Sequence, residues 1–273
     1  MKKFETFTEW TTEFAKEGAF EHLNQMVAFD EWHKWPSPEA LESLMPYELA
    51  NKAGKPIHFI PQAPAQDFSA VAYEEIIYQT GNIPTRSKSW HDLFGALIWC
   101  LFPKTKALLN QLHYDDIQQF GKKERTKRRN ALTLFDECGV ILVSKNKELI
   151  NALRQHEWKS AFIDQRDCWG QADKAGVVAY QFGHANYEML TKPYDGLTGK
   201  FLHIEMSAAL CGLPVNVQYR LIDDALHDKI QSGALDNNEQ LSPLPLLGVP
   251  DWYSGNEDEA YYDNEDYFRP KSR

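Results

Sequence analysis

The chain has 273 residues, 43% of them hydrophobic and 25% charged, so it can bury a sizeable core without disulfides or a structural metal. This composition excludes collagen-like, low-complexity and wholly disordered proteins. The 29 basic and 39 acidic residues leave a formal net charge of −10, which argues against a protein that binds nucleic acid nonspecifically.

The first residues and the cysteines indicate where the protein works. The positive start at residues 1–3 is not followed by the unbroken apolar segment of a secretory signal. The longest apolar stretch, 93–102, is about half as long as the roughly 20 residues of a membrane span. The cysteines stand too far apart for a CxxC metal pair: Cys100, Cys138, Cys168 and Cys211. We therefore expect a cytoplasmic protein with reduced thiols and no membrane partner.

In chain order, the first elements are helices and a short strand. Apolar residues at helical spacing predict helices over 5–28 and 38–52, the second beginning after Ser37 with Pro38 at its first position. Residues 57–60 resemble a strand. The run 71–78 is rich in β-branched and aromatic residues and favours a strand, although Glu74 and Glu75 also allow a helix. Residues 80–86 contain Gly and Pro and break regular structure.

The middle of the chain carries the clearest helix. Ser89 is a helix N-cap with Asp92 three residues later, and this helix ends or kinks at residues 102–103. A second helix covers 104–120 and stops at Gly121. The β-prone runs 131–135 and 140–143, joined by a short loop with Gly139, predict a β-hairpin. Further on we expect helices at 149–156, 186–190 and 215–230 and strands at 177–182 and 201–206.

These elements predict an α+β protein, because hairpins and helices mix without regular alternation. We expect one domain with a small mixed or antiparallel sheet and packed helices. Its parts are a helical N-terminal extension over 1–54, an α+β core over 55–250 and an acidic aromatic C-terminal arm over 251–273. Residues 251–266 hold seven acidic side chains and no basic one, which is typical of a solvated tail. Their aromatic content instead favours an arm whose residues 251–270 are ordered and pack on the core.

Five local patterns connect the chain to a known family. They are GNIPTR at 81–86, HDLFGALIW at 91–99 leading into FPK at 102–104, ALTLFDE at 131–137, GHA at 183–185 with Glu188, and PLLGVPDW at 245–252. Together they resemble the bacterial family of domain of unknown function 3025 over roughly residues 55–270. The resemblance implies a single family domain in a bacterial cytoplasm, and it implies no reaction because the family has no assigned activity.

Histidines and carboxylates provide the sharpest chemical signal. His91 and Asp92 are adjacent, as are Asp136 and Glu137, and we take these four as candidate catalytic residues. The alternative is structural: Asp92 suits a helix cap, and Asp136 with Glu137 suits a hairpin turn. A comparison with HD-type metal phosphohydrolases, which would add His58, is weak because that fold is helical.

His184 and Glu188 are candidate metal ligands. Four residues apart on a helix, they lie on one face and could share a divalent ion or a proton. Mixed nitrogen and oxygen ligands suit zinc, manganese or iron. The plain alternative is an ion pair within one helix.

Two basic features could bind an anion. Arg86, just ahead of the helix that starts near His91, is a candidate for holding a carboxylate or phosphate of the substrate, or it forms a salt bridge with a nearby acid such as Glu74. Residues 122–129 hold six basic side chains in eight positions. This run could touch phosphate, but a solvated loop, or a partner for the acidic arm, is the commoner role.

Two functions of different classes follow. The first is a hydrolase that uses a His/carboxylate pocket, with or without a divalent metal ion, on a small anionic or phosphoester substrate. The second is a noncatalytic binding or interaction module whose His, Asp and Glu pairs are caps and ion pairs. The arrangement of the candidate residues in space distinguishes the two.

Overall fold

A four-stranded sheet lies at the centre of the computed structural model, which describes residues 6–63, 69–172 and 176–271. The sheet has the order β4-β3-β5-β6 and is mixed, because β3 and β5 run parallel while the outer strands are antiparallel to their neighbours. All six residues of β3 are buried, as expected for a strand covered on both faces. The strands are β3 (Gly139–Ser144), β4 (Val177–Gln181), β5 (Thr198–Ile204) and β6 (Ser242–Pro245).

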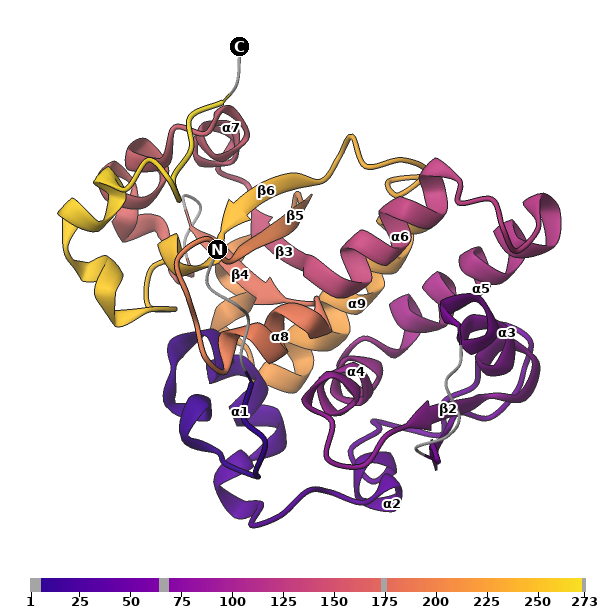
Figure 1. Ribbon diagram of the computed structural model, residues 1–273. Helices are drawn as coiled ribbons and strands as arrows, with labels where there is room; N and C mark the ends of the chain where they lie inside the picture. Colours follow the sequence, from indigo (N-terminus) through magenta and orange to yellow (C-terminus); the bar gives the residue numbers. More distant parts are fainter. Residues whose placement is uncertain (1–5, 64–68, 173–175, 272–273) are drawn as a thin grey trace.

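Helices cover this sheet and extend to one side of it. Helix α6 packs on β5 and on α8, α8 packs on α4, and α9 contacts both β5 and α5. Figure 1 shows α3, α4 and α5 gathered on one side of the sheet, with the C-terminal residues on the other. The helices are α3 (Ala70–Thr80), α4 (Trp90–Leu101), α5 (Pro103–Phe120), α6 (Lys127–Cys138), α7 (Lys147–Gln155), α8 (His184–Leu190) and α9 (Val215–Gln231). The predicted α+β class is therefore confirmed.

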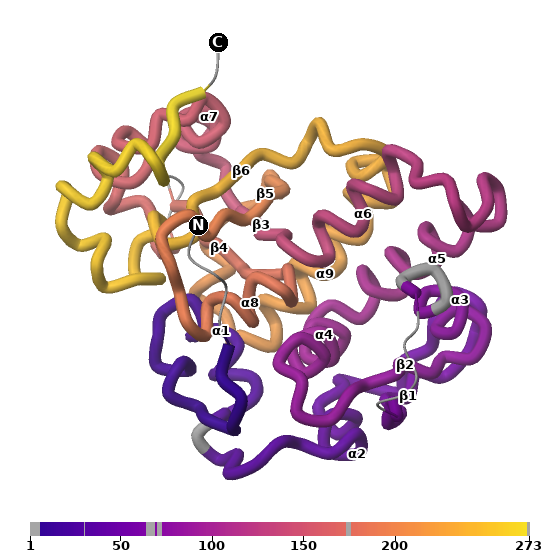
Figure 2. The backbone as a smooth tube through the Cα atoms, in the orientation of Figure 1, coloured from indigo at the N-terminus to yellow at the C-terminus, as the bar shows by residue number. Residues whose placement is uncertain are grey.

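A second, two-stranded sheet lies at the edge of the molecule beside α3 (Figure 2). Its strands β1 (His58–Pro61) and β2 (Asn82–Thr85) are parallel, with Phe59 opposite Ile83. The expectation that 80–86 lack regular structure is therefore wrong over β2. Pairing with β1 places Pro84 in a strand at the edge, where its missing N–H is tolerated.

The N-terminal helices are shorter than expected. The predicted helix over 5–28 contains 3-10 turns at Glu13–Lys16 and Gly18–Phe20 before α1 (Glu21–Val27), and the helix predicted over 38–52 is α2 (Pro38–Glu42). A Cβ on Gly18 would lie 1.8 Å from the Asp251 carbonyl oxygen, so tertiary contact shapes the first segment. Pro46 discourages an extended second helix. Residues 1–5, and 272–273 of the predicted arm, lie outside the described residues.

The predicted β-hairpin is wrong, because residues 131–135 belong to α6. Thr126 caps this helix by accepting a hydrogen bond from the Arg129 amide, and the helix runs directly into β3. Ala131, Leu132 and Phe135 are buried, which is the spacing of a helix face rather than alternation along a strand. A short apolar run fits both the helical and the strand spacing of apolar residues, and tertiary packing decides which element forms.

The strand favoured at 71–78 is likewise replaced by a helix, α3. Asn110 of α5 donates to both the backbone and the side-chain oxygen of Glu74, which anchors α3 against α5. Ile77 is buried in the core. Glu74 and Glu75, which allowed a helix, indicated the correct element, whereas the β-branched and aromatic residues of this run did not.

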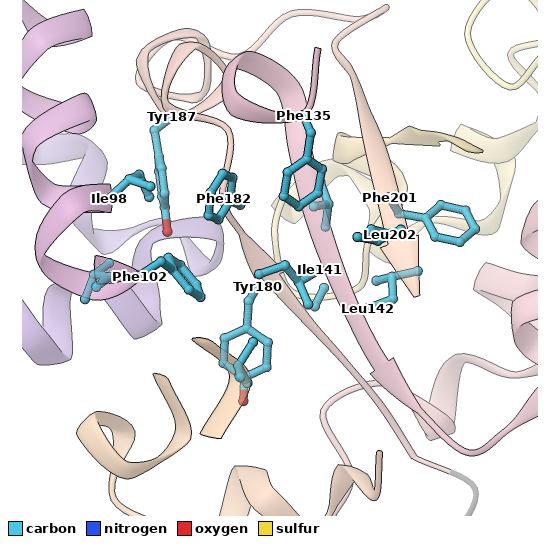
Figure 3. Close-up of a cluster of buried hydrophobic side chains, with 14 of the residues drawn as sticks. Ile98, Phe102, Phe135, Ile141, Leu142, Tyr180, Phe182, Tyr187, Phe201 and Leu202 are labelled. Atoms are coloured by element: carbon cyan, nitrogen blue, oxygen red, sulfur yellow. The ribbon is translucent and has the colours of Figure 1, made fainter. Parts of the chain in front are cut away.

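One aromatic and aliphatic core joins the helices to the sheet (Figure 3). The ring of Phe182, just after β4, lies 4.7 Å from that of Phe135 on α6 and 5.1 Å from that of Phe102, between α4 and α5. These rings fix the ends of α4 and α6 relative to the turn that begins α8. That turn is where the candidate site residues meet.

The C-terminal arm packs on the core as expected. Trp252, Tyr262, Tyr267 and Phe268 are buried, and Arg166 donates to Asn256 of the arm. Among the described residues, no helix is both long and apolar enough to cross a membrane.

Candidate His/carboxylate site

Three side chains from three helices converge at the centre of the site. His91 lies in the first turn of α4, Glu137 in the last turn of α6, and His184 is the first residue of α8. The Nε2 atoms of the two histidines are 3.0 Å apart, and Nε2 of His184 lies 3.6 Å from Oε2 of Glu137. One ligand atom from each residue lies within 4.8 Å of the others, close enough for all three to share one metal ion after a small adjustment.

A second carboxylate stands behind each histidine. Oε2 of Glu188 lies 3.3 Å from Nδ1 of His91, and Oδ2 of Asp136 lies 3.7 Å from Nδ1 of His184. A carboxylate that accepts a hydrogen bond from Nδ1–H orients a metal-ligating histidine and leaves its Nε2 lone pair for the metal. Glu188 is close enough to His91 for such a bond, whereas Asp136 lies beyond hydrogen-bond distance of His184, whose buried Nδ1 has no hydrogen-bond partner among the described residues. Both Nε2 atoms face the same point as Glu137.

Lys106 of α5 completes this set. Its ammonium group donates to Oδ1 of Asp136 at 2.5 Å and lies 5.5 Å from the centre of the Trp99 ring. Burial raises the pKa of Asp136, but the charge of Lys106 and its hydrogen bond to Asp136 outweigh burial, and the net pKa is lowered. Asp136 is therefore held ionised beside His184.

The two histidines have opposite pKa shifts. Burial lowers the pKa of His184 to about 4, so this imidazole is neutral at pH 7. Burial also lowers the pKa of His91, but its bond to Glu188 and the surrounding negative charges outweigh this and raise the pKa. Burial and the adjacent Asp136 carboxylate raise the pKa of Glu137. Like charges gathered in this way are costly unless a cation or shared protons lie between them.

Close backbone contact brings His184 to Glu137. The amide of Gly183 donates to the carbonyl of Gly139, and a Cβ on Gly183 would lie 2.5 Å from the Glu137 carbonyl oxygen. Glycine is therefore needed at 183 for the start of α8 to approach the junction of α6 and β3. This close contact sets the distance between the two side chains.

Arg86 and Asp92 pair with each other. The guanidinium of Arg86 donates hydrogen bonds to both oxygens of the Asp92 carboxylate, with Nη2 at 2.7 Å from Oδ1. Ser89 caps α4 as predicted. Asp92 thus serves the cap and the ion pair and does not contact the histidines. The predicted structural alternative for Arg86, a salt bridge, is present, although its partner is Asp92 rather than Glu74.

Apart from Glu188, the predicted site residues and Lys106 line one pocket of about 470 Å³. Its walls come from α3, β2, α4, α5 and α6, and His184 enters from α8. Five of the seven predicted site residues therefore come together around the histidines, and Arg86 with Asp92 form an adjacent wall. Glu188 contacts His91, not the point shared with His184. Exposed His58 contacts Glu42, so the HD-type ligand set is not assembled.

Sequence reasoning missed the contribution of α5. Lys106, Asn110 and His113 are buried polar residues on one face of that helix, and Lys106 and His113 line the pocket. Their spacing of four and three residues along an otherwise apolar face was the available signal. Cys138 beside the acidic pair is a poor nucleophile, as its neighbours suggest, because burial and Glu137 raise its thiol pKa to about 11.

The fold and the site define an α+β protein with a His/carboxylate cluster in a polar pocket. Residues 57–272 match the model of the family described as Protein of unknown function (DUF3025). The match spans most of the chain, which therefore belongs to this family, as its motifs predicted. No curated protein and no solved structure matches the chain. The family's description states no activity, so the function has to be argued from the site.

Proposed function

We propose that this protein is a divalent-metal-dependent hydrolase of small anionic esters, with phosphoesters as the first candidates. One observation carries the proposal. Nε2 of His91, Nε2 of His184 and a carboxylate oxygen of Glu137 converge on one point, while Glu188 and Asp136 stand behind the two Nδ1 atoms. Without a metal ion, the two Nε2 atoms share a hydrogen bond at 3.0 Å, and the nearby Glu137 oxygen gives the pair the third ligand that a metal ion would need.

The ligand set suits a catalytic metal rather than a structural one. Two imidazoles and one carboxylate leave a coordination position for water, and mixed nitrogen and oxygen ligands suit zinc, manganese or iron. A metal ion held by His91, His184 and Glu137 would supply an activated water as the nucleophile at neutral pH. The side chain of Glu137 is 38% exposed and that of His91 35%, so substrate and water can reach this point.

The pocket suits a small ligand that carries negative charge. Its volume lies in the range of small-molecule sites. Arg86 lines the pocket and is half exposed, and its bonds to Asp92 use Nε and Nη2, which leaves the Nη1 donors for a ligand. In the proposed hydrolysis the water oxygen bonds to phosphorus, the P–O bond to the leaving alcohol breaks, and the proton released by water ends on the leaving oxygen. One water is consumed per ester bond and no redox partner is needed.

We also propose a cytoplasmic location. Cys100, Cys138 and Cys211 are free thiols, which suits a reducing compartment.

Metal binding tests the proposal. Purified protein is stripped with a chelator and titrated with Zn²⁺ and Mn²⁺ by calorimetry, with elemental analysis of the untreated protein. We expect about one ion per chain, lost in the double variant His91→Ala, His184→Ala while circular dichroism stays unchanged. His58→Ala is the control, because this exposed histidine also contacts a carboxylate but lies outside the pocket. Turnover of a chromogenic phosphomonoester is then measured with and without metal.

If the wild type holds no ion, or if the double variant binds it as well as His58→Ala does, the metal-dependent hydrolase is wrong. The histidines would then be structural, and the noncatalytic binding module would be the better account.

A further inference from the structure

Part of the wall of the pocket is cationic. The segment 121–126 joins α5 to α6, and it lines the pocket together with the first turn of α6. The basic residues that this region contributes to the pocket lining are Lys122, Lys123, Arg125 and Arg129. The basic run is therefore part of the pocket. Its carboxylate partners lie on α3 and α5 and at Asp236, rather than on the described part of the acidic arm.

A buried carboxylate fixes the shape of this segment. Asp116 of α5, whose side chain is 1% exposed, accepts a hydrogen bond from Thr126 at 2.8 Å and lies 3.9 Å from Nε of Arg129. Arg129 in turn donates to the carbonyl of Gly121 at the start of the segment and to that of Glu124 within it. The segment is therefore built around an internal ion pair, and its remaining cations are held in place.

Most cations of the pocket already have a carboxylate partner. Arg86 pairs with Asp92, Lys106 with Asp136, Lys122 with Glu75 and Arg129 with Asp116. Lys123 and Arg125 differ: within the described ranges, no carboxylate lies within salt-bridge distance of either. Both are exposed, so their charges are available to a ligand in the pocket.

Arg125 is oriented toward the helix that carries the proposed metal ligand. Its Nη2 donates to Oγ1 of Thr133 on α6 at 3.0 Å. Thr133 and Glu137 are four residues apart, so they share a face of α6 and lie about 6 Å apart along its axis. A guanidinium has five N–H donors, and one bond to Thr133 leaves others for an anion.

We propose that Arg125 and Lys123 form a second anion subsite about one helix turn from Glu137. The proposal rests on the proposed function for the reacting end of the substrate, and it narrows the substrate class. The substrate carries two anionic groups: the ester that reacts at His91, His184 and Glu137, and a phosphate or carboxylate that Arg125 holds at a distance. Bidentate binding by a guanidinium suits either planar or tetrahedral oxyanions.

Two probes with the same skeleton test the second charge. Glycerol 3-phosphate and 3-phosphoglycerate are both three-carbon phosphates. The carbon farthest from the phosphate is a hydroxymethyl group in the first and a carboxylate in the second. Calorimetry with Mn²⁺-loaded protein should show at least tenfold tighter binding of 3-phosphoglycerate. The variant Lys123→Gln, Arg125→Gln should lose this preference while it binds Mn²⁺ as the wild type does.

The matched control is Lys127→Gln. Lys127 belongs to the same basic run and is exposed, but it does not line the pocket, so this variant should keep the preference. Equal affinities of the two probes in the wild type, or a preference that survives Lys123→Gln, Arg125→Gln, would overturn the subsite. Protein that takes up no Mn²⁺ yet shows an Arg125-dependent preference would support the subsite and overturn the proposed function. Thermal melts of both variants check that neither result reflects unfolding.

Discussion

Two neighbouring carboxylates in the site have different environments. Consecutive helix residues point about 100° apart, so Asp136 turns toward Lys106 and Nδ1 of His184 while Glu137 turns toward Nε2. Lys106 holds the pKa of Asp136 down, whereas burial and Asp136 itself raise the pKa of Glu137. In the proposed site, one carboxylate orients a histidine and the other binds the metal.

At the same scale, Glu188 is expected to orient His91. Removing a carboxylate behind a ligating histidine typically weakens metal affinity about 10- to 100-fold. We predict a loss of this size for Zn²⁺ in Glu188→Ala, measured by competition with a chromophoric chelator. The control is Asp228→Ala, which removes an exposed carboxylate 3.1 Å from Nδ1 of His227, a pair outside the pocket. Equal Zn²⁺ affinity in the two variants would show that Glu188 has no such role.

Sequence reasoning succeeded at the residue scale where local chemistry decides. It predicted the Ser89 cap, because residue type and short spacing carry this information. It also chose His91 and Glu137 as candidate catalytic residues and His184 as a candidate metal ligand, and these three side chains lie together, while their roles stay predictions. It paired Glu188 with His184 because the two are four residues apart. In the folded chain Glu188 contacts His91 instead, since α4 packs on α8. Side-chain contacts that depend on tertiary packing could not be predicted from the spacing of residues along the sequence.

The elements position the site through helix ends. His91 begins α4, Glu137 ends α6 and His184 begins α8, so each side chain projects where its helix meets a loop or strand. Sequence patterns predicted α4 and part of α8 but not α6, whose apolar run also fits a strand. With residues 131–143 taken as a hairpin, the continuous helix face from Arg129 through Thr133 to Glu137 could not be foreseen.

The close approach at Gly183 gives a prediction at the element scale. In Gly183→Ala the added Cβ meets backbone atoms of Glu137, Cys138 and Gly139, which cannot move aside as a flexible side chain can. We expect a loss of about 1–3 kcal/mol in the free energy of unfolding, typical of overpacking, together with weaker Zn²⁺ binding.

Gly212→Ala is the control for this substitution, because a Cβ there meets nothing within 4 Å. Urea unfolding followed by circular dichroism gives the stability of both variants. A Gly183→Ala protein as stable as Gly212→Ala, with unchanged Zn²⁺ affinity, would show that the contact does not set the site.

At the scale of the whole molecule, the site lies between the helices α4 and α5 and the layer formed by α6, α8 and the sheet (Figure 1). The N-terminal segment reaches this region from outside the family match: the indole N–H of Trp90, next to His91, donates to the Phe7 carbonyl. The fold class followed from the irregular mixture of predicted helices and strands, and the packed arm followed from its aromatic content. The convergence of residues 91, 137 and 184 depends on long-range packing, which one sequence cannot supply.

The most direct test of the central claim is an anomalous-scattering map from crystals of Zn²⁺-loaded protein, recorded on both sides of the zinc absorption edge. If the metal site is as proposed, the map shows one peak about 2.0–2.2 Å from Nε2 of His91, Nε2 of His184 and a carboxylate oxygen of Glu137. Glu188 and Asp136 should keep their contacts with the two Nδ1 atoms. A map without a peak at this point, or with zinc bound only elsewhere, would show that these three residues do not form a metal site.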